Sequence, residues 1–139
     1  MQKVQIEQIR FELTWRIRHE VMYPDLPFDA IKLDDDPSGI HFGLYAADQL
    51  TAVVSLFNRD NIYQFRKFAT LVSEQGKGYG ALLLNHIITY VKDMGGKKLW
   101  CNARVSATGF YNKFGFRETD QTSISNGIDF VIMELQLNN

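Results

Sequence analysis

Three glycines within five positions, Gly76, Gly78 and Gly80, mark the stretch of this 139-residue sequence best suited to chemistry. A glycine has no Cβ atom, so its backbone can take positive φ and a ligand can approach it closely. Several N–H groups can then point into one small volume, and the N-terminus of a following helix adds positive potential. The pattern is that of a phosphate-binding turn, with a purely structural turn as the alternative.

The residues on both sides of the turn predict the elements that hold it in place. Residues 68–72 are apolar or β-branched, which predicts a strand. After the turn, apolar residues recur at helical spacing, at Leu84, Ile87, Ile88, Val91 and Met94. Gly95 and Gly96 then predict the end of this helix. The turn therefore joins a strand to the N-terminus of a long helix.

Three familiar motifs do not fit the sequence. A P-loop would need Gly-Lys-Ser/Thr at its spacing, and that is absent. The dinucleotide fingerprint fails because the glycines fall as G-x-G-x-G and no second βαβ unit with a ribose-binding acid follows. An EF-hand beginning at Asp34 would need Glu at position twelve, where Tyr45 stands, so calcium is rejected.

The spacing that fits is Gln/Arg-x-x-Gly-x-Gly/Ala, which Gln75, Gly78 and Gly80 satisfy. With the strand before it and the helix after it, this motif resembles the acetyl-CoA motif of the GNAT N-acetyltransferases. A second segment, ATGFYNKFGF over residues 107–116, resembles the Ala-x-x-x-Tyr-x-x-x-Gly-Phe pattern that follows the fifth strand in that family. The resemblance covers residues 40–116 well and the two ends only in outline.

The resemblance implies acetyl-CoA as cosubstrate and no metal. Pantetheine would pair with the strand before the turn, and the pyrophosphate would sit on the N–H groups of the turn. The implied cofactor contacts are Phe68, Thr70, Gln75, Gly76, Lys77, Gly78, Tyr79, Gly80 and Ala81. Many family members carry Asn seven residues before the motif tyrosine. In this sequence that position is Arg104 and Asn102 lies two places earlier, so both are cofactor candidates.

The resemblance also implies direct attack of a neutral amine on the thioester carbonyl. Tyr111 would be the acid that protonates the departing thiolate, and a backbone N–H near Thr70 would stabilise the oxyanion. Histone-type members have a glutamate base where this sequence has Gln64, whose amide cannot take a proton. The base is then another residue, or a water held by a polar group, and three candidates stay open: His41, Glu74 and Arg66.

The expected fold class is α/β (α+β), in a GNAT-like acyl-CoA N-acyltransferase fold. A mixed sheet of six to seven strands would be flanked by helices and splayed between strands 4 and 5, in one N-acetyltransferase domain over residues 1–139. Hydrophobic patterning predicts strands over residues 3–9, 40–47, 51–57, 62–72 and 98–103, helices over 11–22 and 106–114, and a closing antiparallel pair over 116–119 and 127–137. The strand before the helix and the strand after it should be parallel.

The same patterning predicts which side chains enter the core. The first helix should bury Leu13, Ile17 and Val21, and the last strand should contribute Ile128, Phe130, Ile132 and Leu135. The polar residues of the first helix, including Arg18, are expected to face solvent, with contact between its arginines and an anionic ligand as the alternative. His41 and Cys101 are interpreted as structural side chains, Cys101 being buried and unreactive.

Residues 23–39 contain all three prolines and five aspartates, which predicts an irregular connector. Its acidity leaves two interpretations open: a plain connector, or part of a wall that binds a cationic or amine ligand. The acceptor itself, an amine on a small molecule, a peptide or a protein, is not identified by the sequence.

Composition limits the partners and the compartment. The 15 basic residues against 16 acidic ones, a net charge of −1, predict no general attraction to nucleic acid or to an anionic membrane. A single cysteine excludes an internal disulfide framework and favours the cytoplasm. Homodimerisation through the closing strands stays open. The alternatives to an enzyme are a non-catalytic CoA-binding or regulatory GNAT-like domain, favoured by Gln64, and an unrelated nucleotide-binding module.

Overall fold

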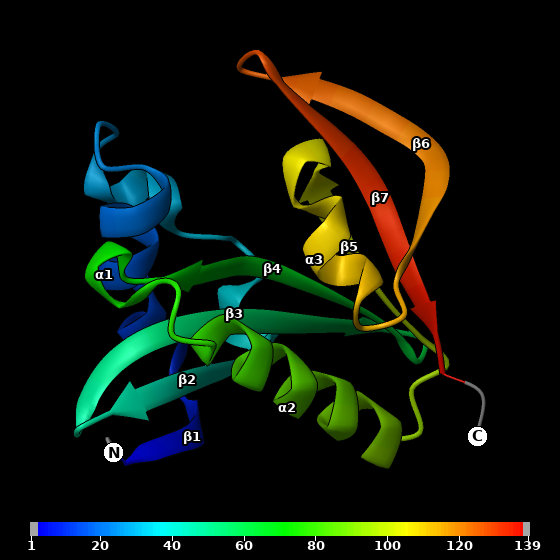
Figure 1. Ribbon diagram of the computed structural model, residues 1–139. Coiled ribbons are helices and arrows are strands. Elements are labelled where there is room, and N and C mark those ends of the chain that lie inside the picture. The colour runs from blue at the N-terminus through cyan, green and yellow to red at the C-terminus, as the bar shows by residue number, and fades with distance from the viewer. Residues whose placement is uncertain (1–2, 138–139) are drawn as a thin grey trace. The chain divides into compact units, whose positions relative to one another are not determined.

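The computed structural model describes residues 3–137 and contains a mixed seven-stranded sheet in the order β1-β2-β3-β4-β5-β7-β6 (Figure 1). β4 and β5 are parallel, whereas β1–β2, β2–β3, β5–β7 and β6–β7 are antiparallel pairs. The predicted mixed sheet is therefore confirmed. The strands are β1 (Val4–Ile9), β2 (Ile40–Ala46), β3 (Gln49–Arg59), β4 (Ile62–Thr70), β5 (Lys98–Arg104), β6 (Arg117–Ser125) and β7 (Ile128–Gln136).

The helices differ greatly in length. The long one is α2 (Tyr79–Asp93), and α3 is the short helix Thr108–Asn112. Along the predicted first helix, a 3₁₀ turn (Phe11–Thr14), α1 (Trp15–Ile17) and a π-helical turn (Arg18–Met22) follow one another. The predicted helical extent is confirmed, but the segment is not one continuous α-helix. None of the helices within residues 3–137 has the length and apolar character needed to cross a membrane.

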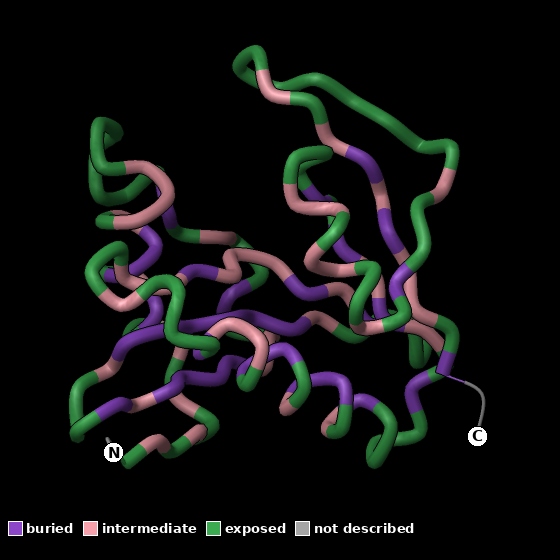
Figure 2. Tube along the Cα trace, viewed as in Figure 1, coloured by how far each residue is buried: buried purple, intermediate pink, exposed green. Residues whose placement is uncertain are grey.

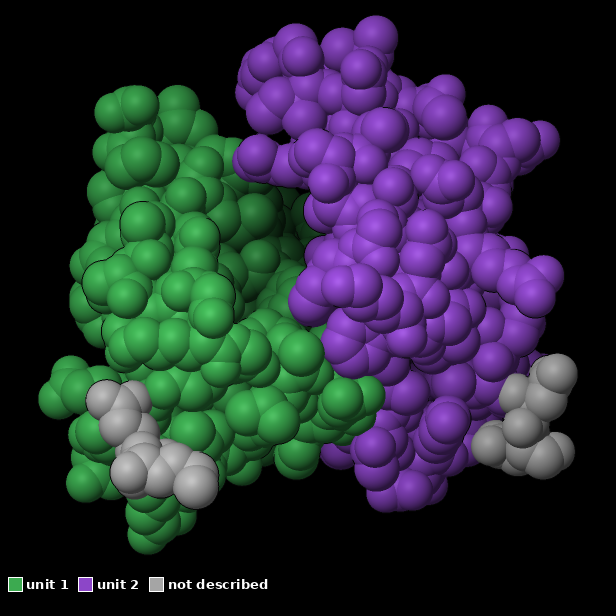
Figure 3. Space-filling view, viewed as in Figure 1, with its two compact units in different colours: residues 1–57, 66–87 green, residues 58–65, 88–139 purple. Residues whose placement is uncertain are grey.

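The chain forms two compact units (Figure 3). Unit 1 contains residues 1–57 and 66–87, and unit 2 contains residues 58–65 and 88–139. Three elements, β3, β4 and α2, contribute residues to each unit. The expected single domain over residues 1–139 stays a prediction.

The core of unit 1 is centred on β2 and β3, which are buried along most of their length (Figure 2). Residues 52–56 of β3 are all buried, as expected for a strand covered on both faces. The first part of α2 packs against this sheet, where the rings of Phe42 and His86 lie 5.1 Å apart. Leu83, Leu84 and Ile87 of α2 are fully buried, so the predicted apolar stripe is confirmed for this part of the helix.

In unit 2 the parallel ladder between β4 and β5 is short. It runs from the pair Ile62–Lys98 to the pair Gln64–Trp100. On its other edge, β5 pairs with β7 over its whole length, Lys98 to Arg104. Residues 101–104 of β5 continue to pair with β7, whereas the ladder between β4 and β5 ends at Trp100. This is the separation expected between strands 4 and 5.

The closing hairpin corrects two predictions. β6 continues to Ser125, far beyond the predicted residue 119, because Asn126 and Gly127 form the turn with φ of 52° and 76°. The buried residues of the last strand are Val131, Met133 and Leu137. The predicted set, Ile128, Phe130, Ile132 and Leu135, is only half-buried. For Ile128, Phe130 and Ile132 the prediction chose the wrong face of the strand, whereas Leu135 lies on the same face as Val131 and Met133 and is only half-buried.

The first helical segment corrects two further predictions. Leu13, expected in the core, is 41% exposed. Arg18, expected at the surface, is fully buried. The change from 3₁₀ to α to π geometry alters the angular spacing of residues, so a single helical period does not describe which side chains point inward.

Candidate active site

Phe68 and Thr70 lie at the end of β4, on either side of the buried Ala69. Just before them, Lys67 has a φ of 55°, a left-handed conformation within a strand. Such residues interrupt the ladder and redirect the strand. The Lys67 ammonium donates to the Tyr23 hydroxyl at 3.0 Å and lies 4.6 Å from the centre of its ring. Contacts from a distant segment therefore hold the strained residue next to the two predicted pantetheine-pairing positions.

The predicted phosphate turn follows a 3₁₀ turn at Val72–Glu74. Gly76 and Gly78 have φ of 83° and 84°, and a Cβ atom added to either would meet no atom within 4 Å. The two glycines are thus required by their backbone conformation and not by tight packing. Open space in front of the turn is what a bound phosphate would need.

The N-terminus of α2 follows directly. The Gly78 carbonyl accepts from the Leu82 N–H at 3.2 Å, which closes the first turn of the helix. Gly80 and Ala81 lie in that turn, where backbone N–H groups have no carbonyl one turn earlier. A helix of 15 residues adds a positive end to the turn, so backbone and helix together favour an anion.

Two side chains of the turn already have partners within unit 1. Gln75 donates its side-chain amide to the Thr70 carbonyl at 3.0 Å, which ties the turn to the end of β4. Lys77, which is exposed, forms an ion pair with Glu74 at 2.8 Å. The hydrogen bond to Glu74 raises the pKa of Lys77. The turn is thus braced by side chains while its glycine backbone stays accessible.

The candidates of unit 2 lie on β5. Asn102 and Arg104 are exposed and alternate with the buried Cys101 and Ala103, as the pleat of a strand requires. Burial raises the pKa of the Cys101 thiol to about 12, so the prediction of a buried, unreactive cysteine is confirmed. Asn102 lines a pocket together with Gln64.

Tyr111 lies on α3, against the rings of Phe65, Phe110 and Phe116 at centroid distances of 5.8, 5.2 and 5.9 Å. Burial, followed by the nearby Cys101, raises the pKa of its phenol above the ordinary value of 10.0. Tyr111 is therefore protonated at neutral pH, and its hydroxyl can donate to negative charge that develops beside it.

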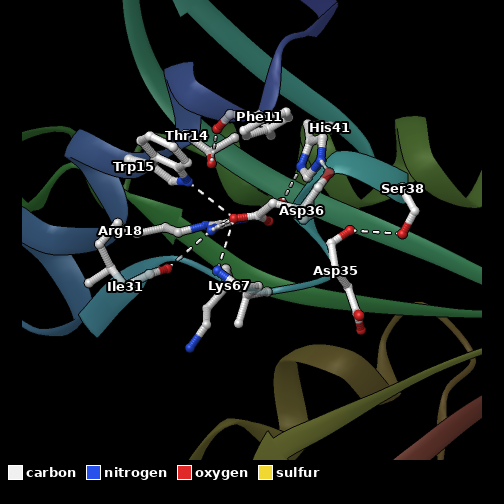
Figure 4. Close-up of polar contacts among 12 residues, drawn as sticks. Phe11, Thr14, Trp15, Arg18, Ile31, Asp35, Asp36, Ser38, His41 and Lys67 are labelled. Atoms are coloured by element: carbon white, nitrogen blue, oxygen red, sulfur yellow. Dashed lines mark hydrogen bonds and ion pairs between the residues drawn. The ribbon is translucent and has the colours of Figure 1, made fainter. Parts of the chain in front are cut away.

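A buried ion pair joins Arg18 of the first helical segment of unit 1 to Asp36 of the connector (Figure 4). Arg18 donates both terminal nitrogens to the two carboxylate oxygens of Asp36, each at 2.8 Å. Asp36 also accepts from Trp15 and from the Leu33 N–H. Burial alone would raise the pKa of Asp36, but the hydrogen bonds from Arg18, Leu33 and Trp15 outweigh it and hold the pKa at about 2.

His41 belongs to the same network. Its Nε2 lies 2.9 Å from the carbonyl of Asp36 and must donate to it, so Nδ1 accepts from the Ser55 hydroxyl at 2.7 Å in the neutral ring. Ser55 in turn accepts from Arg18 at 2.8 Å. Burial lowers the pKa of His41. The interpretation of His41 as a structural side chain is therefore confirmed, and sequence reasoning missed the network that it serves.

The remaining candidates for holding a catalytic water also have partners. Glu74 is paired with Lys77, and Arg66 lies 5.8 Å from the ring centre of Phe57. Within residues 3–137 there is no group of three or more His, Cys, Asp or Glu side chains that could hold a metal ion. Unit 1 thus brings the predicted cofactor residues Phe68 to Ala81 together, while Asn102, Arg104 and Tyr111 belong to unit 2.

A model of the acetyltransferase (GNAT) domain matches residues 19–137 of this chain. The uncharacterized N-acetyltransferase YitI of Bacillus subtilis is 27% identical over 124 residues, which cover 83% of each chain. The ribosomal protein bS18-alanine N-acetyltransferase of Haemophilus influenzae is 28% identical over 118 residues, covering 84% of this chain and 81% of the relative.

Solved structures show the same fold. A putative N-acetyltransferase from Lactobacillus plantarum superposes with a TM-score of 0.86 at 21% identity, covering 97% of this chain and 99% of the other. A Bacillus subtilis acetyltransferase in complex with CoA has a TM-score of 0.75 at 20% identity, covering 99% of this chain and 100% of the other.

Proposed function

The chain belongs to the GNAT acetyltransferase family, whose members transfer acetyl from acetyl-CoA to an amine, and we propose which residues perform this transfer. The observation that carries the proposal is the turn after β4, with left-handed glycines at Gly76 and Gly78 and the first turn of α2 behind them. It favours binding of the CoA pyrophosphate by the backbone of residues 76–81, with Gln75 and Lys77 beside it.

The pantetheine arm would extend along β4 as an added strand would. Phe68 and Thr70 supply the backbone groups for that pairing, beyond the point where the β4–β5 ladder stops. Asn102 and Arg104 are the residues of β5 proposed to contact the cofactor from unit 2. No metal takes part in the proposed transfer.

The chemistry is the attack of a neutral amine nitrogen on the thioester carbonyl carbon. A backbone N–H near Thr70 stabilises the oxyanion, the carbon–sulfur bond then breaks, and Tyr111 gives its proton to the CoA thiolate. The raised pKa of Tyr111 keeps the phenol protonated at neutral pH, so its hydroxyl is available as a donor to the sulfur. Gln64 carries no basic group, so the amine loses its proton to another residue or to a water held by a polar group such as Glu74 or Arg66.

Calorimetric titration with acetyl-CoA, CoA, ATP and NAD tests the cofactor. We expect tight binding of the two CoA species and none of ATP or NAD, and a preference for ATP or NAD would exclude the proposed site. Release of free CoA thiol with a panel of amines then tests catalysis. Binding of CoA without amine-dependent release would favour the non-catalytic alternative.

Replacement of Tyr111 by Phe tests the acid. Removal of the hydroxyl should lower kcat about 100-fold, within the range for general acid catalysis, and leave the affinity for acetyl-CoA within about twofold. Phe110→Leu, a change in the neighbouring ring without loss of a proton donor, is the control. An unchanged kcat for Tyr111→Phe would remove Tyr111 from the mechanism.

We further propose a cytoplasmic location, on the ground that the only cysteine is a buried free thiol. Cell fractionation checks this location. Homodimerisation is proposed through β6, which ends the strand order and is exposed along nearly its whole length. The oligomeric state in solution, measured by analytical ultracentrifugation, decides between monomer and dimer.

A further inference from the structure

A pocket of about 310 Å³ opens on one face of unit 2. Four strands contribute to its wall. The lining residues are Gln64 of β4, Trp100 and Asn102 of β5, Ile132 of β7, and Gln121, Thr122 and Ser123 of β6. This pocket is separate in sequence from the glycine turn, and of its lining residues Asn102 is also a proposed cofactor contact.

The wall of the pocket contains no charged side chain. Side-chain amides and hydroxyls both donate and accept hydrogen bonds, and they come from Gln64, Asn102, Gln121, Thr122 and Ser123. Trp100 and Ile132 add apolar surface. Of the charged residues on the neighbouring strands, Lys98 and Glu134 pair with each other at 3.2 Å. The lining itself is therefore suited to a neutral polar group and supplies no counter-ion, and Arg104, the next residue of β5 on the same face as Asn102, is not part of it.

β6 has an irregular register beside the residues that line this pocket. Between Glu118 and Thr122 the register shifts, so that three residues of β6 face the single residue Ile132 of β7. The Thr119 hydroxyl donates to the Ile132 carbonyl at 2.8 Å and accepts from the Gln121 N–H at 3.2 Å, which holds this bulge. Bulges of this kind redirect side chains and are common beside functional sites.

The pocket also lies where β4 and β5 part. Gln64 and Trp100 form the last pair of the parallel ladder, and both line the pocket. Under the proposed function, the pantetheine arm follows β4 from this point onward. We infer that the pocket binds the part of the acceptor beyond its reacting amine, and that this part is an uncharged hydrogen-bonding group such as a carboxamide or a peptide bond. The inference rests on the proposed acetyl transfer.

Three primary amines built on the same three-carbon chain test the inference: β-alaninamide, β-alanine and 1,3-diaminopropane. Their far ends are a carboxamide, a carboxylate and a group that is an ammonium at neutral pH. With rates corrected for the fraction of free amine, we expect kcat/KM for β-alaninamide to exceed both others at least about tenfold. A preference for either charged end would overturn the inference.

A charged variant adds a second test. Ser123→Asp places a carboxylate in the wall and should shift the ratio of diamine to amide kcat/KM at least about tenfold toward the diamine. Ser125→Asp is the matched control, since Ser125 is exposed on the same strand and outside the pocket lining. The control ratio should equal that of the wild type. If Ser123→Asp does not fold, the nearly isosteric Gln121→Glu in the same lining gives the same test.

The outcomes separate the two proposals. A protein that binds acetyl-CoA but acetylates none of the three amines overturns the pocket assignment, as does an unchanged ratio in the folded charged variant. Failure of the wild type to bind acetyl-CoA instead overturns the proposed function. Titration of each variant with acetyl-CoA should give a dissociation constant within about twofold of the wild type, because the substitutions lie outside the proposed cofactor site.

Discussion

The glycine turn and the Arg18–Asp36 network are both parts of unit 1, yet they are built in opposite ways. The turn is local, exposed and made by backbone, and residues 75–81 supply nearly all of it. The network is buried and made by side chains that are 14 to 37 residues apart, as in the His41–Ser55 and Arg18–Ser55 contacts. A binding surface has to stay open, whereas a buried charge has to be fully paired. We therefore expect substitutions in the turn to affect ligand binding and substitutions in the network to affect stability.

The largest expected effect is on the network. Arg18→Leu leaves the buried carboxylate of Asp36 without its cation and should lower the free energy of unfolding by about 3–5 kcal/mol. Arg16→Leu is the control, because Arg16 pairs with Glu20 at the surface, with side chains 61% and 48% exposed. The control should change the free energy by about 0.5 kcal/mol or less in urea denaturation. Equal losses in both variants would show that the buried pair contributes no special stability.

The next effect is on the turn. Gly78→Glu puts a side chain and a negative charge into the proposed phosphate site and should weaken CoA binding at least about 100-fold. Gly95→Glu is a matched control, since Gly95 follows the other end of α2 with a φ of 78° and open space around its Cβ position. Both variants should lose about 1 kcal/mol of stability from backbone strain. Calorimetry that shows equal CoA affinity in the two variants would remove the turn from the cofactor site.

The third effect is a pH dependence of stability. The pKa of Asp36 in the folded protein is about 2, against an ordinary value of 3.8. A lowered pKa stabilises the fold at pH values above the ordinary pKa, and this stabilisation is lost as pH falls through about 2. The loss should amount to about 2 kcal/mol. Urea denaturation at pH 5 and at pH 2 measures it, and Asp36→Asn should lack this part of the pH dependence. An identical pH dependence in the variant would contradict the lowered pKa.

The smallest expected effect is the loss of CoA affinity when the Lys77 side chain is replaced and the glycine backbone of the turn is kept. Lys77 is exposed and already paired with Glu74, so Lys77→Met should weaken CoA binding only about twofold to fivefold. The loss should shrink as the salt concentration rises, because exposed charges are screened. Lys92→Met, at the exposed far end of α2, should change nothing. A loss as large as that of Gly78→Glu would mean that the lysine, and not the glycine backbone, binds the phosphate.

Sequence patterns predicted the parts of the fold that depend on local rules. The glycine turn could be predicted because positive φ favours glycine, and α2 because its apolar residues repeat at helical spacing. The parallel pairing of β4 and β5 followed from the helix between them. These features are specified by neighbouring residues, so they can be predicted without knowledge of distant contacts.

The features that escaped prediction depend on distant partners. Arg18 is buried because Asp36 and Ser55 meet it there, and a charged residue gives no local sign of such a partner. In β7 both faces are apolar, so alternation did not decide which side enters the core. The bulge that brings Gln121 into the pocket lining was likewise not predicted, since it is held by a hydrogen bond to another strand. Contacts between residues far apart in the sequence decide all three features: the burial of Arg18, the buried face of β7 and the bulge in β6.

The two compact units have a consequence for how this chain can be divided. The chain passes from one unit to the other at residues 57–58, 65–66 and 87–88. The second of these crossings lies inside β4 and the third inside α2, whereas separable domains usually meet in exposed linkers. A single cut therefore cannot release either unit as one continuous piece with complete elements. A single recombination crossover at any of the three boundaries would divide β3, β4 or α2 between two parent genes. We therefore expect this fold to be inherited whole.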